Sequence, residues 1–404
     1  MSNDTIVGLD IGTTKICAVV GRINEEESLE IIGVGSSPAK GVRKGIITNI
    51  DQAVWSIRQA VEAAESMSGS KIESVIAGIS GNHIQAINSH GVVAVRSKEI
   101  GKVDIARVME NARAISLSPD RDIIHAISQE YIVDEQSGIK DPIGMSGVRL
   151  EVKAHIITGS IALVQNVIKS CNRAGLDVSD IILEPLASAK AILSSDETEL
   201  GVAMIDIGGG TTDLAVFYDD SIRYTKVLGV GGNQFTHDIA VGIRTPEKQA
   251  EKIKIKYASI DDWTSSEETI EVPGISGRQS REISKGDLYG IVQPRAEELF
   301  YLIKNELDSN GFESMLTGGI VLTGGGSMLG GMVKFAEEFF NMPARIGVPY
   351  DITGIRDMVE GPQYATVVGL IKYGIENSNT IGRKKPFGQN SIFERMKRWF
   401  KEMF

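Results

Sequence analysis

Two stretches of the chain combine the residue types that hold a phosphate group. Residues 6–15 (IVGLDIGTTK) and residues 204–213 (MIDIGGGTTD) each carry an apolar run into Asp-Ile-Gly and two threonines. Glycines let a turn bend so that successive backbone N–H groups converge on an anion, and threonine hydroxyls add donors. The two copies, 196 residues apart, predict two strand-turn-strand hairpins in related, facing halves that grip one nucleoside triphosphate.

Candidate ligands follow from these residue types. Asp10 and Asp206 end the first strand of each hairpin, where a carboxylate can hold Mg²⁺ through water. A single copy would also suit an ordinary hairpin with Asp and Gly in its turn, but the duplication favours a nucleotide. No Gly-Lys-Thr follows the glycines, so neither copy is a Walker A loop. The predicted phosphate contacts are Gly12, Thr13, Thr14 and Lys15 in the first copy and Gly208, Gly209, Gly210 and Thr211 in the second.

A third glycine-rich stretch could lie against the nucleoside. Residues 320–327 (IVLTGGGS) read as a strand that enters a glycine turn ahead of a helix, which lets backbone approach a sugar or purine. Between the second and third stretches lie a Gly-Gly-Asn turn and a charged helix, which taken alone would be a plain turn and a solvated helix face. The candidate residues here are Gly232, Asn233, Glu251, Lys254, Gly324, Gly325 and Gly326.

Composition narrows the class of protein. The 404 residues suggest two or three domain-sized units, and 42% hydrophobic with 24% charged residues is the balance of a globular protein. The net charge of −11 argues against nucleic acid as the main partner. Two cysteines favour a reducing compartment, and no secretory signal is expected. Residues 314–333 are uncharged but too glycine-rich for a membrane span.

Apolar periodicity predicts alternating strands and helices. Strands are expected at 6–10 and 16–20, before a polar turn over 21–30, and at 74–80 and 92–95. An insert over 84–159 should hold a helix at 103–115 and strands at 123–133 and 148–158. Helices are predicted at 51–67 (with Asp51 as a possible cap), 160–174, 184–193, 247–256, 295–307, 332–340 and 363–375, then a polar linker over 376–390 and a last helix over 391–404.

The order of these motifs resembles the superfamily of actin, hexokinase and the heat-shock-chaperone ATPases. Its five signatures appear at 6–20 (phosphate one), 182–193 (connect one), 204–217 (phosphate two), 320–332 (adenosine) and 363–374 (connect two). Residues 182–189, 229–233 and 348–354, together with the C-terminal helix, resemble the FtsA family of bacterial actin-like division proteins. The resemblance implies an α/β, two-lobed, actin-like (ribonuclease-H-like) fold with an inserted subdomain.

Further expectations come from the resemblance alone. It implies ATP and Mg²⁺ in a cleft between lobe one (1–83 and 160–202) and lobe two (203–362), with a connecting helix at 363–375. The insert over 84–159 would be the subdomain peculiar to the family, called 1C. The helix containing Arg295 resembles the part that docks the FtsZ tail. Other implied partners are further copies in a filament and later division proteins such as FtsN.

Glu184 is the candidate for a catalytic role. It opens the connect-one helix, where chaperone relatives place a residue that orients the attacking water, and a carboxylate there could act as a general base. It is equally a first-turn acid that favours the helix dipole. The resemblance implies slow or conditional ATP hydrolysis, so the chain is expected to use nucleotide mainly as a conformational and assembly ligand.

The C-terminal stretch has two chemically distinct faces. Projected as a helix, its large apolar residues fall in an arc of roughly 140°. From Arg383 onward seven Lys or Arg and two Glu give +5, which leaves −16 for the rest of the chain. A basic face opposite Trp and Phe suits an anionic membrane surface, although docking on the chain's own core or in a partner groove would use the same pattern. The apolar face holds Ile392, Phe393, Met396, Trp399, Phe400, Met403 and Phe404, and the basic residues are Arg395, Lys397, Arg398 and Lys401.

These observations predict an actin-like protein that binds ATP in the cytoplasm. It would polymerise on the inner membrane at the division site, anchor the FtsZ ring through its tail and recruit later partners. The main alternative is a small-molecule kinase of the same superfamily, which would need a hydroxyl acceptor site and a base near the terminal phosphate. A chaperone ATPase would need a long peptide-binding domain, and a pilus-assembly homologue would not need the tail.

Overall fold

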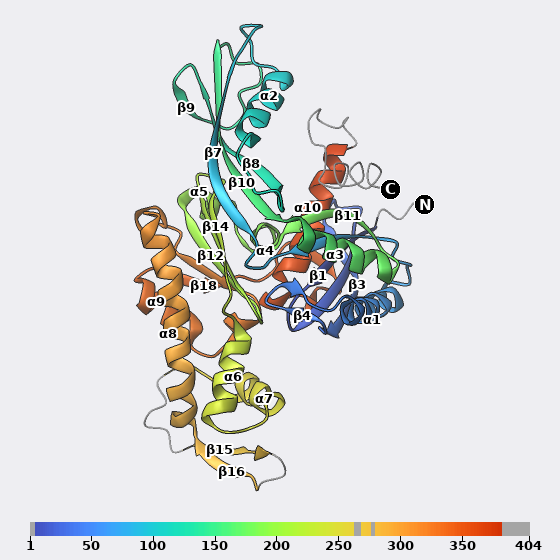
Figure 1. The fold of residues 1–404 in the computed structure, drawn as a ribbon, viewed down its shortest axis with the longest axis vertical. Coiled ribbons are helices and arrows are strands. Elements are labelled where there is room, and N and C mark those ends of the chain that lie inside the picture. The colour runs from blue at the N-terminus through green and yellow to red at the C-terminus, as the bar shows by residue number, and fades with distance from the viewer. Residues whose placement is uncertain (1–4, 262–267, 276–278, 382–404) are drawn as a thin grey trace.

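The computed structural model describes residues 5–261, 268–275 and 279–381. Two lobes, each built on one mixed sheet, lie side by side, and a smaller third sheet stands above them (Figure 1). The predicted two-lobed α/β architecture with an insert is therefore present. No helix in the described part of the chain is long and apolar enough to cross a membrane.

Lobe one contains a six-stranded sheet in the order β11-β6-β1-β2-β3-β19. Helices α1 (Ile50–Ser68) and α3 (Ile161–Ala174) cover one face, and α4 (Glu184–Ile192) and α10 (Ala365–Ile381) cover the other. Residues on alternate sides of each central strand fill both cores, because side chains alternate along a strand. The strands are β1 (Thr5–Ile11), β2 (Lys15–Ile23), β3 (Leu29–Pro38), β6 (Ser74–Ile79), β11 (Asp177–Leu183) and β19 (Ile352–Gly354), with a short hairpin of β4 (Val42–Arg43) and β5 (Ile46–Ile47).

Lobe two contains a five-stranded sheet in the order β14-β13-β12-β17-β18. The strands are β12 (Val202–Ile207), β13 (Thr212–Tyr218), β14 (Ser221–Leu228), β17 (Ile320–Thr323) and β18 (Ala344–Ile346). One core joins this sheet to its helices and centres on the fully buried Phe300. The other elements are α5 (Ser195–Leu200), α6 (Gly232–Gly242), α7 (Glu247–Tyr257), β15 (Thr269–Val272), β16 (Arg281–Ser284), α8 (Lys285–Ser309) and α9 (Met332–Phe340).

The two lobes repeat one arrangement around the predicted hairpins. β1 and β2 pair antiparallel with Asp10 opposite Cys17, and β12 and β13 pair with Asp206 opposite Asp213. In each lobe the first strand of the hairpin also pairs in parallel with a further strand, β6 or β17. The duplicated motif thus marks two related halves, as predicted.

The insert is a four-stranded sheet, in the order β7-β10-β8-β9, that carries one helix. In the sequence it lies between β6 and α3 of lobe one, but in the fold it also contacts β14 of lobe two. Gln129 Nε2 donates to the Ile222 carbonyl at 2.7 Å, and His155 Nε2 lies 3.0 Å from Thr225 Oγ1. The insert therefore spans both lobes. Its elements are β7 (Gln85–Ala94), α2 (Lys102–Arg113), β8 (Arg121–Val133), β9 (Gln136–Ile139) and β10 (Arg149–Ser160).

Several predicted boundaries were wrong. The cap of α1 is Asn49, whose side chain accepts from the Gln52 amide, while Asp51 pairs with Arg173. The polar stretch 21–30 is mostly strand, because β2 and β3 extend until only residues 24–28 form the turn. Helix α8 begins ten residues before Arg295, since Ser284 forms a capping box and Pro294 is accommodated within the helix.

Two differences concern the C-terminal part. The connecting helix α10 runs to Ile381, so its last turns occupy the first residues of the stretch predicted as a linker from residue 376. The remainder of that stretch and the predicted amphipathic helix over 391–404 lie outside the described residues.

Candidate functional site

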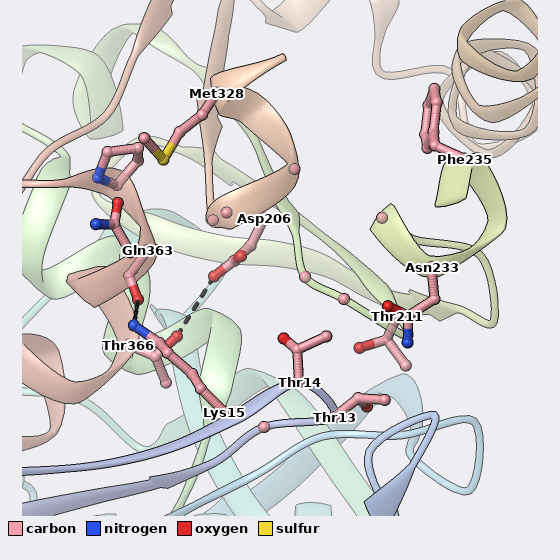
Figure 2. A pocket seen from close by; sticks show the side chains of 18 of the residues that line it. Thr13, Thr14, Lys15, Asp206, Thr211, Asn233, Phe235, Met328, Gln363 and Thr366 are labelled. Atoms are coloured by element: carbon pink, nitrogen blue, oxygen red, sulfur yellow. Dashed lines mark hydrogen bonds between the residues drawn. The ribbon is translucent and has the colours of Figure 1, made fainter. Parts of the chain in front are cut away.

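A cavity of about 420 Å³ lies between the two lobes, where both hairpin turns and the third glycine loop meet (Figure 2). The residues that line the cavity are spread along the chain between Asp10 and Thr366, so several distant segments together form the wall. Among the predicted residues, the wall contains Asp10, Gly12, Thr13, Thr14, Lys15, Glu184, Asp206, Gly208, Gly209, Thr211, Gly232, Asn233, Glu251, Lys254, Gly324, Gly325 and Gly326.

The two hairpin turns touch each other across the cleft. A Cβ built on Gly209 would lie 2.5 Å from the Thr14 side chain, and one on Gly210 would lie 2.7 Å from Thr13 Oγ1. Gly210 is therefore a contact between the turns and not part of the cavity wall, where it had been predicted. Glycine suits both positions because a side chain there would have to displace the facing threonine or move the two turns apart.

Asp206 is held by hydroxyl groups from the two helices beneath the cleft. Ser188 Oγ of α4 donates to Asp206 Oδ2 at 2.8 Å, and Thr366 Oγ1 of α10 approaches the same oxygen at 3.5 Å, as Figure 2 shows for Thr366. The two hydroxyls are 2.9 Å apart. These bonds fix the direction of the carboxylate at the end of β12, while its other oxygen faces Gly324.

Four buried carboxyl groups crowd this cavity, and burial raises the pKa of each. Desolvation raises the pKa of Asp10 to about 6, although Lys15 opposes the shift, and raises the pKa of Asp213 to about 8. The pKa of Glu184 is well above its usual range because of burial and the neighbouring aspartates, and burial also raises that of Asp206. A cation bound beside these groups would favour their ionised forms and lower their pKa values.

These shifts predict how the unliganded protein responds to pH. A carboxyl whose pKa is raised in the fold binds more protons there than in the unfolded chain, so stability falls as pH rises through its folded value. Between pH 6 and 8.5 the free energy of unfolding should drop by on the order of 2 kcal/mol. Denaturant titration without nucleotide should show this drop reduced in Asp213→Asn and unchanged in the exposed Asp357→Asn. Equal slopes in all three proteins would contradict the assignment.

Lys15 lines the cavity but is already engaged. Its Nζ donates to the Gln363 carbonyl at 2.8 Å (Figure 2) and lies 3.8 Å from the centre of the Tyr364 ring. The ammonium therefore ties β2 of lobe one to the segment just before α10. It still lies beside Asp10, whose pKa it lowers against the effect of burial.

Helices α6 and α7 shape the opposite wall. Lys254 Nζ donates to the Gly232 carbonyl at 3.0 Å and pairs with Glu251 at 2.7 Å. The amides of Gly232 and Asn233 in turn donate to the carbonyls of Gly208 and Gly209 in the second hairpin turn. The predicted nucleoside residues and the predicted phosphate residues of lobe two thus form one connected wall.

The third glycine loop requires glycine for two reasons. Gly324 has φ +79°, a left-handed conformation, and a Cβ there would lie 2.3 Å from Asp206 Oδ1. A Cβ on Gly326 would lie 2.3 Å from the Ile207 side chain. The loop can therefore pack directly over the end of β12, which brings its backbone into the cavity.

Sequence reasoning missed several residues of the cavity. Gln363 is the most informative, because its Oε1 is buried and has no hydrogen-bond partner within the described chain. Most buried polar atoms in folded proteins have a hydrogen-bond partner, so this acceptor is an exception; the amide packs against Gly361. Only its place at the start of connect two could have drawn attention to it. The other missed wall residues include Gly45, Asp213, Phe235, Met328 and Thr366.

Arg295 lies apart from the cavity. Its guanidinium forms a bidentate pair with Asp238 of α6, at 2.5 and 3.1 Å, and also contacts Glu298. The pair with Asp238 joins α6 to α8 through Nε and Nη2, while Nη1 contacts Glu298 of the same helix. The site residues gathered in the cleft are therefore separate from the predicted partner-binding residue.

Comparisons with known proteins agree with this architecture. The model of the SHS2 domain inserted in FtsA matches residues 81–158, and the model of cell division protein FtsA matches residues 203–369. Cell division protein FtsA of Pseudomonas aeruginosa is 45% identical over the whole chain and 99% of its own length. A chain of the PilM–PilN type IV pilus biogenesis complex shares the fold with a TM-score of 0.67 and 18% identity, over 92% of this chain and 98% of its own. MreB5 of Spiroplasma citri bound to AMPPNP shares it with a TM-score of 0.58 and 15% identity, over 95% of this chain and 100% of its own.

The two lobes around a central cleft define a protein with the actin-like ATPase fold. Within that class, two findings identify the family: the 45% identity to an FtsA protein along the full chain, and the match of the insert to the SHS2 domain of FtsA. The chain belongs to the FtsA family of cell division proteins.

Proposed function

We propose that this chain binds a magnesium–adenine nucleotide between its lobes, polymerises on the inner membrane and anchors the FtsZ ring there. Membership of the FtsA family supports the role in division. The observation that carries the nucleotide proposal is the pair of glycine-threonine turns that meet across one cavity. Gln363, another residue of this wall, carries a buried Oε1 without a hydrogen-bond partner in the described chain.

The residues of the cavity fit this ligand. The turn amides and hydroxyls of Thr13, Thr14 and Thr211 would bind phosphate, and the wall from Gly232 to Lys254 together with residues 324–326 would hold the nucleoside. Bound Mg²⁺ would neutralise phosphate charge and orient the phosphate chain. Asp10 and Asp206 would hold it through water. No cluster of three metal-ligating residues occurs within the described chain, so phosphate oxygens and water would complete the coordination.

Glu184 is our proposed water-orienting residue, and its environment argues for slow hydrolysis. A general base must be ionised, but burial and neighbouring carboxylates raise the pKa of Glu184 well above its usual range. Burial therefore disfavours the ionised form of Glu184 in the unliganded cleft. We infer that nucleotide acts chiefly as a ligand that sets conformation and assembly.

Attachment to the membrane would come from residues 391–404. Partial burial of the apolar face and about 1 kcal/mol from each basic residue near anionic lipid would offset the cost of ordering the helix only modestly. A single copy should bind reversibly, whereas a filament that displays many tails gains from effective concentration. FtsZ would bind near Arg295, and later proteins such as FtsN would be recruited on the cytoplasmic face of the inner membrane at the division site.

Sedimentation with anionic vesicles tests the proposal. The full chain should pellet with vesicles, and more strongly with Mg²⁺–ATP, whereas the chain without residues 391–404 should remain in the supernatant. Trp399→Glu should also reduce pelleting, while Glu394→Gln on the polar face should not. Vesicle binding that persists without the tail would refute the anchor and would favour a function like that of a pilus-assembly homologue.

A small-molecule kinase of the same superfamily remains the alternative activity. A coupled assay with sugars and other hydroxyl acceptors separates the two. We expect no phosphoryl transfer above the rate of hydrolysis, and transfer to any acceptor would overturn the assignment.

A further inference from the structure

A small hairpin in lobe one ends at the cavity. β4 and β5 pair with Val42 opposite Ile47 and Arg43 opposite Ile46, which leaves Lys44 and Gly45 as a two-residue turn. Both have positive φ, +49° and +72°, as in a type I′ turn. Gly45 lines the cavity, so Lys44 is one residue away from its wall.

The hairpin is anchored to lobe one, but its tip reaches lobe two. Ile47 is buried in the lobe-one core, and the Gly45 amide donates to Thr13 Oγ1 at 3.0 Å. The Lys44 side chain crosses the cleft, where its Nζ would lie 3.6 Å from a Cβ built on Gly229. Gly229 directly precedes Val230, whose carbonyl accepts from Thr212 in the second hairpin.

Lys44 differs from the other lysines of the cleft because its charge is uncommitted. Lys15 is bound to a carbonyl and an aromatic ring, and Lys254 is bound to Glu251 and the Gly232 carbonyl. Lys44 is exposed and has neither an ion pair nor a hydrogen bond within the described residues. A triphosphate would add negative charge to a cavity that already holds Asp10, Glu184, Asp206 and Asp213.

We propose that Lys44 closes the site over the terminal phosphate of a bound nucleoside triphosphate. This inference rests on the nucleotide-binding function proposed above. The nucleoside wall, formed by α7 and the third glycine loop, belongs to lobe two, whereas the hairpin tip contacts the first phosphate turn through Thr13. A flexible ammonium at the tip can reach the outermost phosphate and tie the two lobes together when that phosphate is present.

The substitution Lys44→Asn tests the charge of Lys44 without disturbing the turn that carries it. Asn-Gly is the preferred pair for a type I′ turn, so the variant loses the ammonium while its hairpin becomes at least as stable. Arg43→Asn is the matched control, since it removes the same charge one residue earlier. Titration of the full chain with Mg²⁺–ATP and Mg²⁺–ADP should show ATP affinity about tenfold weaker in Lys44→Asn. ADP affinity should stay within about twofold, and Arg43→Asn should match the parent for both.

Each other outcome has a definite meaning. Unchanged ATP affinity in Lys44→Asn, or an equal loss in Arg43→Asn, would overturn the role of Lys44. Equal losses for ATP and ADP would overturn the terminal-phosphate assignment. If the parent chain binds neither ATP nor ADP, the proposed function itself fails. This failure differs from a failure of the Lys44 proposal, in which the parent chain still binds nucleotide.

Discussion

Asp206→Asn is expected to abolish most nucleotide binding without weakening the unliganded fold. The amide oxygen of asparagine can still accept from Ser188 and Thr366, so the local hydrogen bonds survive. The substitution also removes one of four carboxyl groups whose pKa is raised chiefly by burial in the empty cleft. The melting temperature without nucleotide should therefore equal or exceed that of the parent.

The loss appears only when Mg²⁺–ATP is added. Removing one charged contact to a buried cation costs roughly 3 kcal/mol, or about 100-fold in affinity. Thermal shift and calorimetric titration measure the two effects separately. Asp220→Asn is the matched control, because it makes the same change in lobe two at an exposed turn position with φ +49° that asparagine tolerates. A normal ATP-dependent shift in Asp206→Asn would disprove the magnesium role.

The local motifs of the cleft were predictable because each is a strand and turn defined by adjacent residues. Asp10 and Asp206 end their strands as expected, and the glycines beside them allow close approach. Gln363 and Thr366 were missed as site residues because no local pattern distinguishes them. They enter the cavity only because the chain returns to lobe one at residues 362–366, after the whole of lobe two in the sequence.

The insert shows the same limit. Periodicity predicted its helix and the strands β8 and β10, but it predicted only residues 92–95 of the β7 region and missed β9. The contact with lobe two was not predicted either. That contact depends on polar pairs distant in sequence, such as Gln129 with the Ile222 carbonyl and His155 with Thr225. Burial lowers the pKa of His155 to about 4, so the ring is neutral at pH 7. The buried, neutral ring therefore has a structural role at this contact between the insert and lobe two.

Gly369→Ala is expected to destabilise the protein strongly, because α4 and α10 cross at this residue. A Cβ on Gly369 would lie 1.8 Å from the Ala187 carbonyl oxygen, so the two helices would have to separate. These helices carry Ser188 and Thr366, the hydroxyls that hold Asp206. The free energy of unfolding should fall by about 3 kcal/mol, and ATP affinity should fall with it.

Gly290→Ala provides a control of opposite sign. Gly290 also lies inside a helix, α8, but a Cβ there would meet no atom within 4 Å. Alanine should therefore raise the free energy of unfolding by about 0.5–1 kcal/mol through helix propensity alone. Denaturant titration of both variants compares the same chemical change at the two sites. Because only the crossing of α4 and α10 supports the cleft, nucleotide affinity should change in Gly369→Ala and stay constant in Gly290→Ala; equal behaviour would show that this crossing does not position Asp206.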